Sequence, residues 1–375
     1  RYVRPVMVNF PSTNRLYKEP YGTVLIIAPW NYPFQLVFSP LIGAIAAGNT
    51  VVIKPSEHSA NTSRVVSEII AAVFDPGHVK VIEGDVPVAA RLLRERWDYI
   101  FFTGSIAVGK IVAKAAAEHL TPVTLEMGGK NPCVVDETAN IPLAARRIVW
   151  GKFINCGQTC IAPDYVLVHK KVKNQFVESC KKEITRIYGD DPRQSPDYGR
   201  IINHPNFEVL KRSLAGEKIL SGGNTDPDDL YIEPTLLDNP DKDNHVMKHE
   251  IFGPVLPVIS YDTEQEIHDC INSYEKPLAF YIFSNHVKFI KQLIALHSFG
   301  GGTVNDTIVH FANHRFPFGG VGHSGIGAYH GKHSFDTFSF SKGITTRYNW
   351  LDLPVRYAPY RDKMKMLKFF MRWFS

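Results

Sequence analysis

The chain has 375 residues, of which 44% are hydrophobic and 21% charged, and its formal net charge is +5. This length is enough for two domains with a large core, and so mild a positive charge gives no indication of a nucleic-acid partner. The five cysteines are scattered and odd in number, and no apolar run is long enough for a membrane span, so we expect a protein of the reducing cytoplasm with neither a disulfide framework nor a transmembrane helix.

Up to Lys130 the chain alternates between strand-like and helix-like runs. Short apolar, β-branched or aromatic runs predict strands at Val24–Ala28, Thr50–Ile53, Val79–Ile82, Tyr99–Thr103 and Val123–Leu125. The runs between them predict helices at Pro33–Ala47, Asn61–Phe74, Val86–Arg94 and Ala107–His119. This alternation predicts an α/β fold with a doubly wound parallel sheet, which binds ligands at the carboxyl ends of its strands.

A second α/β region follows, with a strand at Tyr165–His169, a helix over Val172–Tyr188 and a loop rich in Gly, Asp and Pro at Ser221–Asp229. From Val304 the chain is rich in Gly, Phe and His, and it then turns basic. These changes in composition indicate a second domain and a separate C-terminal region.

Asn31 lies between two prolines in the segment Pro29-Trp30-Asn31-Tyr32-Pro33, directly after a predicted strand. The prolines rigidify the turn, so the Asn31 amide is directed towards the strand ends, where it can donate to an oxyanion that develops on a carbonyl. The alternative is an asparagine that caps the next helix.

Two further strand ends indicate a nucleotide site. Lys54 and Glu57 follow the second strand and could hold the two hydroxyls of a ribose, or simply solvate a loop. Gly104 and Gly109 bracket a strand-to-helix turn where a pyrophosphate could bind, although their spacing differs from G-x-G-x-x-G and a plain tight turn is equally compatible.

Glu126 stands just before the pair Gly128-Gly129, and a carboxylate in a partly apolar cleft is a plausible general base. The alternative for Glu126 is an ion pair with Lys130.

Cys156 and Cys160 lie four residues apart in an uncharged stretch punctuated by glycine. A cysteine is the most nucleophilic side chain near neutral pH and can form a thioester, but most free cysteines are small buried hydrophobes.

Glu250 and Phe252 precede Gly253-Pro254 and would point to the same side of an extended segment. One could bind a ribose while the other packs against a flat heterocycle. The alternative is an ordinary strand end.

The order of these motifs along the chain resembles the aldehyde dehydrogenase superfamily over about residues 3–342. The segments Pro317–Gly325 and Tyr329–Phe338 are similar to class 3, the branch that includes the fatty aldehyde dehydrogenases. The resemblance implies a homodimer with a cofactor-binding sheet, a second catalytic α/β domain and a small bridging or oligomerisation element. The expected boundaries are 1–18 for a bridging segment, 19–126 for the NAD-binding domain, 127–303 for the catalytic domain, 304–342 for a return to the NAD-binding and bridging region, and 343–375 for the basic tail.

By motif match, Cys160 attacks the aldehyde carbon, Asn31 and the Cys160 backbone N–H hold the oxyanion, and Glu126 activates the water that releases the acid. Cys156 is expected to be structural. The resemblance also implies a set of cofactor-binding residues: Lys54 and Glu57 at the adenosine ribose, Gly104 and Ser105 near the pyrophosphate, Glu250 and Phe252 at the nicotinamide ribose and ring, and Val108 and Gly128 beside them.

The resemblance implies oxidation of medium- or long-chain aliphatic or aromatic aldehydes to carboxylic acids, with NAD as the cofactor and NADP also accepted. Glu57 would compete with a 2′-phosphate, which favours NAD. Two other functions stay open: a CoA-acylating dehydrogenase, against which Glu126 argues, and a non-catalytic structural or binding role.

The family's N-terminal helical segment has no counterpart before Arg1, and since that segment packs on the cofactor domain, we expect its absence to affect stability and cofactor affinity.

Histidines at helical spacing do not indicate a metal site. His310 and His314 are four apart and His330 and His333 three apart, but no H-E-x-x-H motif occurs and no carboxylate completes a ligand set. We therefore expect no metal.

The last fifteen residues predict a basic amphipathic helix. On a helical wheel the cations gather on one face, and the apolar side chains lie opposite: Arg361, Lys365, Lys368 and Arg372 against Met366, Leu367, Phe370, Met371 and Phe374. Such a helix suits the inner surface of a membrane. The alternatives are packing on the same chain, on a partner subunit or over the substrate mouth.

If the tail binds lipid, liposomes should float the intact protein but not a variant lacking residues 355–375, because truncation removes the cationic and apolar faces together. Equal flotation of the two proteins would end the membrane hypothesis.

Overall fold

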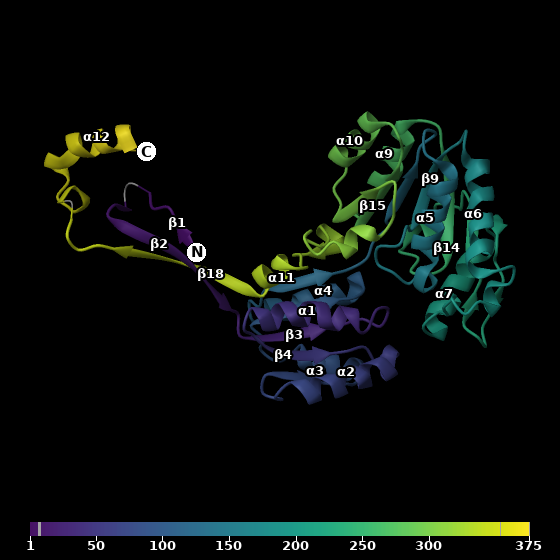
Figure 1. Cartoon of the computed structure of the whole chain (residues 1–375), viewed down its shortest axis with the longest axis horizontal. Helices are drawn as coiled ribbons and strands as arrows, with labels where there is room; N and C mark the ends of the chain where they lie inside the picture. Colours follow the sequence, from purple (N-terminus) through teal and green to yellow (C-terminus); the bar gives the residue numbers. More distant parts are fainter. Residues whose placement is uncertain (7–8, 353, 375) are drawn as a thin grey trace. The chain divides into compact units, whose positions relative to one another are not determined.

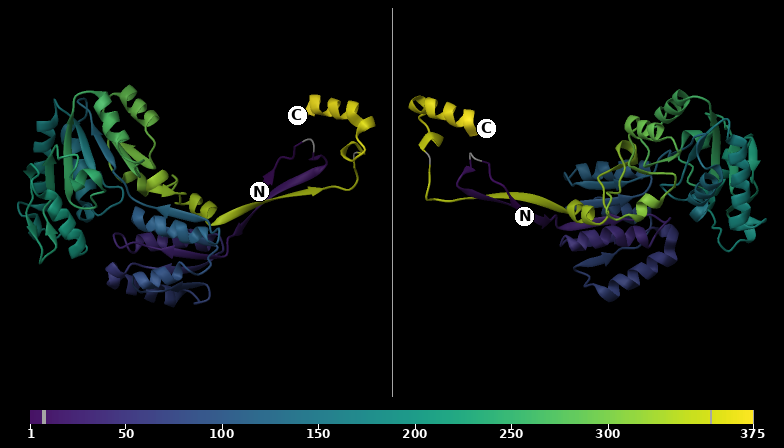
Figure 2. Two further views of the ribbon diagram at one scale, coloured as in Figure 1. Left: turned by 180° about the vertical axis from the view of Figure 1, so that it is seen from behind. Right: turned by 45° about the horizontal axis from the view of Figure 1, so that its top comes forward.

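The computed structural model describes residues 1–6, 9–352 and 354–374. It contains two units, one formed by Arg1–Tyr21 with Ser339–Ser375 and the other by Gly22–Phe338. Figure 1 follows the chain through both units. The described part of the larger unit contains two large sheets, each with its own helices, and a two-stranded sheet. Both views in Figure 2 keep the purple-to-blue first half of this unit distinct from its teal-and-green second half.

The first sheet of the larger unit has the order β17-β7-β6-β3-β4-β5. Its strands are β3 (Thr23–Ile27), β4 (Thr50–Lys54), β5 (Val79–Val81), β6 (Tyr99–Thr103), β7 (Val123–Glu126) and β17 (Gly325–Ile326). All pair in parallel except β17, which is antiparallel to β7. The chain starts at β3 in the middle and winds outwards in both directions, so the predicted doubly wound sheet is confirmed. Its switch point lies between β3 and β6, where ligands bind in such sheets.

Four helices connect these strands: α1 (Gln35–Ala46), α2 (Ala60–Val73), α3 (Val86–Leu92) and α4 (Ile106–Ala117). Alternate residues of β6 face opposite layers, as the two-residue period of a strand requires. Ile100 and Phe102 pack in one core cluster with Val112 of α4, whereas the ring of Phe101 packs against Phe338 on the other face. Both faces of the sheet are therefore buried, which explains why its strands read as continuous apolar runs.

The second sheet has the order β10-β13-β14-β9-β8-β15-β16. Its strands are β8 (Pro132–Val135), β9 (Tyr165–His169), β10 (Ile219–Ser221), β13 (Thr235–Asp238), β14 (Val255–Tyr261), β15 (Ala279–Phe283) and β16 (Gly301–Val304). Its helices are α5 (Ile141–Phe153), α6 (Lys173–Tyr188), α7 (His204–Leu214), α8 (His245–Lys248), α9 (Glu264–Asn272) and α10 (Val287–Leu296). The strand predicted at Tyr165–His169 is observed as β9. In the predicted loop Ser221–Asp229, the structure adds a short strand, β11 (Thr225–Asp226), which pairs with β12 (Tyr231–Ile232). A further helix, α11 (Lys332–Thr337), closes the unit next to α1.

The smaller unit is a three-stranded antiparallel sheet of β1 (Tyr2–Val3), β2 (Ser12–Pro20) and β18 (Ser339–Arg347), followed by α12 (Met364–Phe374). Helix α12 agrees with the predicted tail helix, and the side chains of Lys365, Lys368 and Arg372 on it are exposed. The prediction of an apolar face falls mostly on Leu367, Phe370, Met371 and Phe374, whose side chains lie outside the described part of the structure. No helix in the described ranges combines the length and apolar character that a membrane crossing needs.

Gly43 of α1 should resist replacement by alanine, although Gly→Ala in a helix ordinarily stabilises by up to about 1 kcal/mol. A Cβ at Gly43 would lie 2.5 Å from the Cβ of Ser334 and 3.2 Å from the Phe338 ring. We expect Gly43→Ala to lower the free energy of unfolding by about 1–3 kcal/mol in urea denaturation, because the overpacked helices must separate. The neighbouring Ile42→Ala, at a side chain that is 66% exposed, should change it by no more than about 0.5 kcal/mol. A stabilised Gly43→Ala protein would contradict this packing.

Candidate active site

A cavity of about 340 Å³ opens at the switch point of the first sheet and brings together most of the predicted site residues. It is lined by all three predicted catalytic residues and by five of the predicted cofactor-binding residues: Asn31, Glu126, Cys160, Gly104, Ser105, Gly128, Glu250 and Phe252. These residues are up to about 220 positions apart in the sequence, so only the fold makes them neighbours. Lys54, Glu57 and Val108 do not line this cavity.

The segment before Cys160 has an unusual backbone. Asn155, Cys156 and Gly157 follow one another with φ values of 51°, 55° and 73°, all in the left-handed region that non-glycine residues rarely adopt. At Gly157 a side chain is also excluded by space, because a Cβ would lie 2.2 Å from the carbonyl oxygen of Gly253. The tight turn buries Cys156 completely and leaves Cys160 at the cavity.

Side-chain amides hold this turn in place. The Asn155 Nδ2 donates to the carbonyl oxygens of Asn31 (2.9 Å) and Gln158 (3.2 Å). The Gln158 side chain in turn donates to the carbonyl oxygens of Asn155 and Arg200 and accepts from the Ile202 N–H. A hydrogen bond of 2.7 Å between the Tyr32 and Thr159 hydroxyls adds a second link between the segment around Asn31 and the segment around Cys160. The sequence reasoning missed Asn155, Gln158 and Tyr32, although all three are polar residues close to predicted site residues.

The Asn31 side chain is buried, and its Nδ2 donates to the carbonyl oxygen of Gln158 at 3.1 Å. This bond fixes which end of the amide is the NH2 group and uses one of its two hydrogens. Asn31 does not cap the next helix, because α1 begins at Gln35 after Phe34. The capping alternative is therefore wrong.

The Cys160 thiol lies in a desolvated and acidic environment. Burial raises its pKa to about 12, and the nearby carboxyl groups of Glu250 and Glu126 act in the same direction. The backbone N–H groups of Cys160 and Ile161 act in the opposite direction and lower the pKa of the thiol. The thiol of the protein alone is thus protonated at neutral pH, and its activation requires a base or a bound cation.

Glu126 ends β7 with its side chain fully buried, and neither carboxyl oxygen has a hydrogen-bond partner among the described residues. Burial therefore raises its pKa well above the usual range. Lys130 does not pair with Glu126. Its ammonium group instead forms a buried ion pair with Asp164 and donates to the carbonyl oxygen of Val246 at 2.6 Å. The ion-pair alternative for Glu126 is therefore wrong.

Glu250 is held against a position that lacks a side chain. A Cβ at Gly128 would lie only 2.0 Å from the Glu250 Oε1, so glycine is the residue that leaves room for this carboxyl group. Burial raises the pKa of Glu250 to about 8, and the nearby Asp164 contributes in the same direction. Phe252 has a φ of 47°, so the segment is not extended as the sequence analysis assumed. Phe252 nevertheless lines the cavity, with its ring 5.4 Å from that of Trp30 in an edge-on contact.

The amino end of α4 meets the cavity. Ser105 caps this helix by accepting a hydrogen bond from the Val108 N–H at 3.4 Å, and both Gly104 and Ser105 line the cavity. The partial positive charge of a helix amino terminus favours an anionic group here. Val108 contributes its backbone N–H to this helix cap. The residue is 44% exposed and does not line the cavity.

Lys54 is the last residue of β4, and its ammonium group forms an ion pair with the Glu57 carboxylate at 3.1 Å. Lys54 is only 3% exposed, so it does not simply solvate a loop. Burial acts to raise the pKa of Glu57, but hydrogen bonds from its own backbone N–H and from Lys54 outweigh this and lower it. His58, the next residue after Glu57, lines the cavity.

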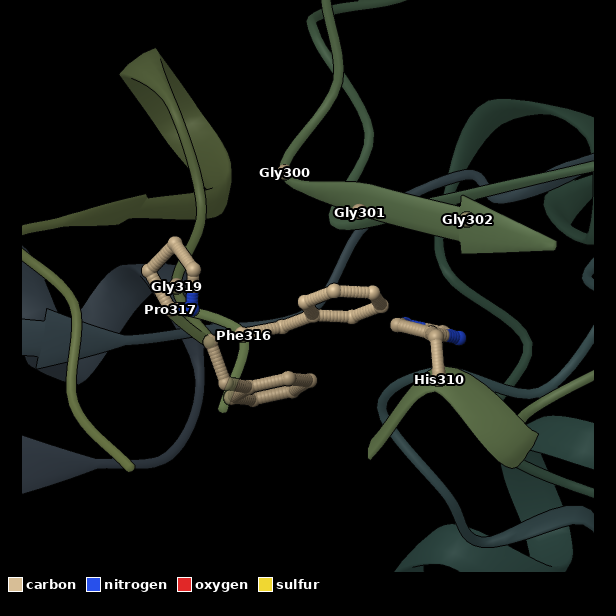
Figure 3. A pocket seen from close by; sticks show the side chains of 8 residues that line it. Gly300, Gly301, Gly302, His310, Phe316, Pro317 and Gly319 are labelled. Atoms are coloured by element: carbon tan, nitrogen blue, oxygen red, sulfur yellow. The ribbon is translucent and has the colours of Figure 1, made fainter. Parts of the chain in front are cut away.

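A second cavity of about 200 Å³ lies beside β16. Figure 3 shows Gly300, Gly301 and Gly302 along the strand, with His310, Phe316 and Pro317 across from them. Phe318 also lines this cavity, and its ring contacts that of Tyr329 at 5.9 Å. Burial raises the pKa of Tyr329 well above its usual range, and the nearby Glu126 and Cys160 raise it further. Phe318 thus links the lining of the second cavity to Tyr329 by a ring contact.

The histidines near Phe318 form an aromatic cluster. His330 stacks on the Phe318 ring at 5.2 Å, and burial lowers the pKa of His330 and of His310 to about 4. Within the ranges that the structure describes, no three His, Cys, Asp or Glu side chains form a group that could hold a metal ion.

Comparison with known proteins agrees with this arrangement. The aldehyde dehydrogenase family model matches residues 6–344. The 4,4'-diaponeurosporen-aldehyde dehydrogenase of Staphylococcus aureus is 51% identical over 97% of this chain and 80% of its own length. Aldehyde dehydrogenase family 3 member A2 of Macaca fascicularis is 53% identical over 86% of this chain and 67% of its own length. The dimeric NADP-preferring aldehyde dehydrogenase of Canis lupus familiaris is 50% identical over 93% and 78%.

Solved structures agree with the fold. The substrate-bound state of Staphylococcus aureus AldH has a TM-score of 0.96 at 50% identity and covers 99% of this chain and 81% of that one. The Mycobacterium tuberculosis aldehyde dehydrogenase complexed with NAD+ has a TM-score of 0.82 at 28% identity, covering 91% and 72%. The predicted family and enzyme class are thus confirmed: the chain belongs to the aldehyde dehydrogenase family and is an oxidoreductase of that family.

Proposed function

We propose that this enzyme oxidises apolar aldehydes to carboxylic acids with NAD(P), through a covalent intermediate on Cys160. The observation that carries the proposal is the single cavity in which a thiol, an oriented amide and an unpartnered buried carboxyl group meet beside the amino end of a helix. Covalent catalysis on a carbonyl needs a nucleophile, an oxyanion donor and a base, and Cys160, Asn31 and Glu126 are of these three kinds.

In the first step the Cys160 sulfur attacks the aldehyde carbon. The developing oxyanion accepts a hydrogen bond from Asn31, whose Nδ2 has one hydrogen left after its bond to Gln158, and from the Cys160 backbone N–H. Because burial raises the thiol pKa to about 12, the sulfur must lose its proton during the approach of the substrate, to Glu126 or to Glu250.

A bound nicotinamide would supply the acceptor for the hydride that leaves the aldehyde carbon, so that a thioester remains on Cys160. Glu126 then takes a proton from a water molecule that attacks the thioester carbonyl, and the acid leaves as the Cys160 thiol reforms. The raised pKa of Glu126 suits this role, because a carboxylate that binds its proton more tightly is a stronger base.

The residues around the cavity fit a nicotinamide dinucleotide. The amino end of α4 with Gly104 and Ser105 suits a pyrophosphate, and the Glu250 carboxyl group against Gly128 suits the hydroxyls of a ribose. Lys54 and Glu57 suit the hydroxyls of the adenosine ribose, although they do not line the cavity itself. The negative charge of Glu57 disfavours a 2′-phosphate, so we propose NAD as the main cofactor and NADP as a second one.

Apolar aldehydes are the proposed substrates, namely medium- or long-chain aliphatic and aromatic ones. The ring of Tyr329 interacts electrostatically with Glu126 and Cys160 and contacts the ring of Phe318, which lines the second cavity together with other aromatic rings and glycines. A 51% identical relative is named for an aldehyde of diaponeurosporene, and this supports a large apolar substrate.

We further propose a homodimer whose basic tail contacts the cytoplasmic face of a membrane. The exposed cations Lys365, Lys368 and Arg372 on α12 support the membrane contact. Support for the dimer comes from a 50% identical relative that is named as dimeric.

Formation of the reduced cofactor from NAD should be seen with hexanal, decanal and benzaldehyde, and Cys160→Ala should lower this rate by about 10³-fold or more, because no thioester can form. Absorbance of the reduced cofactor is the measurement. Cys270→Ser is the matched control, since it removes a thiol that does not line the cavity. If neither the wild type nor Cys160→Ala forms reduced cofactor while NAD still binds, the catalytic role of Cys160 has no basis.

A free acid made equally with and without CoA would rule out the CoA-acylating reaction.

Gly128→Ala should lower kcat/KM for NAD by about 10²-fold, because its Cβ must displace the Glu250 carboxyl group by an ångström or more. Gly129→Ala offers a close control: a Cβ there meets its nearest atoms at an ordinary 3.4 Å. It should retain the wild-type value within about twofold. If the two substitutions lowered kcat/KM for NAD equally, the close approach of Glu250 to Gly128 would not contribute to cofactor use.

A further inference from the structure

Asn131 is a buried residue that contacts the nucleophile segment and has no role in the proposed chemistry. It lies between β7 and β8 and is only 1% exposed. Its Nδ2 donates to the carbonyl oxygens of Cys160 (2.7 Å) and Ala162 (3.1 Å), and its Oδ1 accepts from the Ala279 N–H at 2.8 Å. The side chain thus connects the start of β15 to the residue that carries the thiol.

The bond to the Cys160 carbonyl oxygen determines where the next N–H group points. The carbonyl of Cys160 and the N–H of Ile161 belong to one planar trans peptide, in which the two groups point in opposite directions. Holding the oxygen towards Asn131 therefore turns the Ile161 N–H away from Asn131. That N–H group is one of the two backbone groups that act to lower the pKa of the Cys160 thiol. The following peptide is held as well, because the Tyr281 hydroxyl donates to the Ile161 carbonyl oxygen at 2.5 Å.

We propose that Asn131 is a positioning residue that holds the Cys160–Ile161 peptide in the orientation, with its N–H group directed away from Asn131, that stabilises the thiolate of Cys160. The inference rests on the proposed role of Cys160 as the nucleophile. Because the substrate and the cofactor have no part in the three hydrogen bonds of Asn131, the effect is a property of the protein alone.

The other groups around the thiol disfavour its ionisation, so the effect of the Cys160–Ile161 peptide on the thiolate is important. Two carboxyl groups and three phenols interact electrostatically with the Cys160 thiol: Glu126, Glu250, Tyr32, Tyr281 and Tyr329. The carboxyl groups disfavour a second negative charge at Cys160, and burial does the same. The backbone N–H groups of Cys160 and Ile161 oppose both effects, so the orientation of the peptide between these residues bears directly on how readily the thiolate forms.

Asn49 provides a matched control elsewhere in the same unit. It is fully buried, its Nδ2 donates to the carbonyl oxygens of Ala44 and Phe338 at 2.9 Å each, and its Oδ1 accepts from the Gly22 N–H at 3.0 Å. This is the same pattern of two donated bonds and one accepted bond, but it does not involve the nucleophile segment. Asn→Ser at either position removes equivalent hydrogen bonds without changing the charge.

The test is the rate at which iodoacetamide alkylates Cys160 in the cofactor-free full chain as a function of pH, followed by mass spectrometry of the Cys160 peptide. In Asn131→Ser the midpoint of this profile should rise by about one pH unit, so that labelling below the midpoint is about tenfold slower. The kcat/KM for aldehyde should fall by a similar factor. Asn49→Ser should keep the wild-type midpoint, even if both variants unfold at a lower temperature.

A wild-type midpoint in Asn131→Ser, or equal shifts in the two variants, would overturn the inference. If Asn131→Ser does not fold, Asn131→Thr and Asn49→Thr take its place under the same criteria, because the additional methyl group fills part of the vacated space. Alkylation needs no aldehyde. A shifted profile in an enzyme that does not oxidise aldehydes would therefore support the role of Asn131 while contradicting the proposed function.

Discussion

The active site depends on one constraint, namely that the turn at residues 155–157 is held in a left-handed conformation by side-chain amides. Three successive residues with positive φ are costly, and such a backbone persists only where its surroundings determine it. Here Asn155 and Gln158 provide those surroundings, and Asn155 reaches across to the carbonyl oxygen of Asn31 in the other half of the unit. The same turn leaves Cys160 at the cavity, and its Gln158 carbonyl oxygen accepts a hydrogen bond from the Asn31 amide.

Burial of titratable groups follows from this arrangement and determines the chemistry. Cys160, Glu126 and Glu250 share a desolvated cavity, and the pKa of each is raised because its charged form has lost water without gaining a full set of partners. In the protein alone the Cys160 thiol is therefore protonated at neutral pH, and the two carboxyl groups bind a proton more tightly than usual. The thiol becomes reactive only when a ligand changes the charge in the cavity or a base takes the proton.

Much of the fold could be predicted from the sequence, because β-branched strands and capped helices leave local patterns. The predicted ranges of the first domain agree with β3–β7 and α1–α4 to within three residues at each end. Local reasoning was wrong where a partner lies far away in the sequence. Lys130 is close to Glu126 along the chain but pairs with Asp164, and Phe252 adopts a left-handed φ in a segment that reads as extended.

The sequence by itself determined the family, the α/β class and the residue types needed for chemistry on a carbonyl, since these depend on the order of motifs and on local periodicity. Only the tertiary structure decided which alternatives hold. It excluded Asn31 as a helix cap, placed Cys160 at the cavity while burying Cys156, and gave Asn131 a hydrogen bond to the carbonyl oxygen of Cys160. The physical reason is that hydrogen-bond partners and desolvation come from groups that the fold brings together from distant parts of the chain, and no local pattern encodes them.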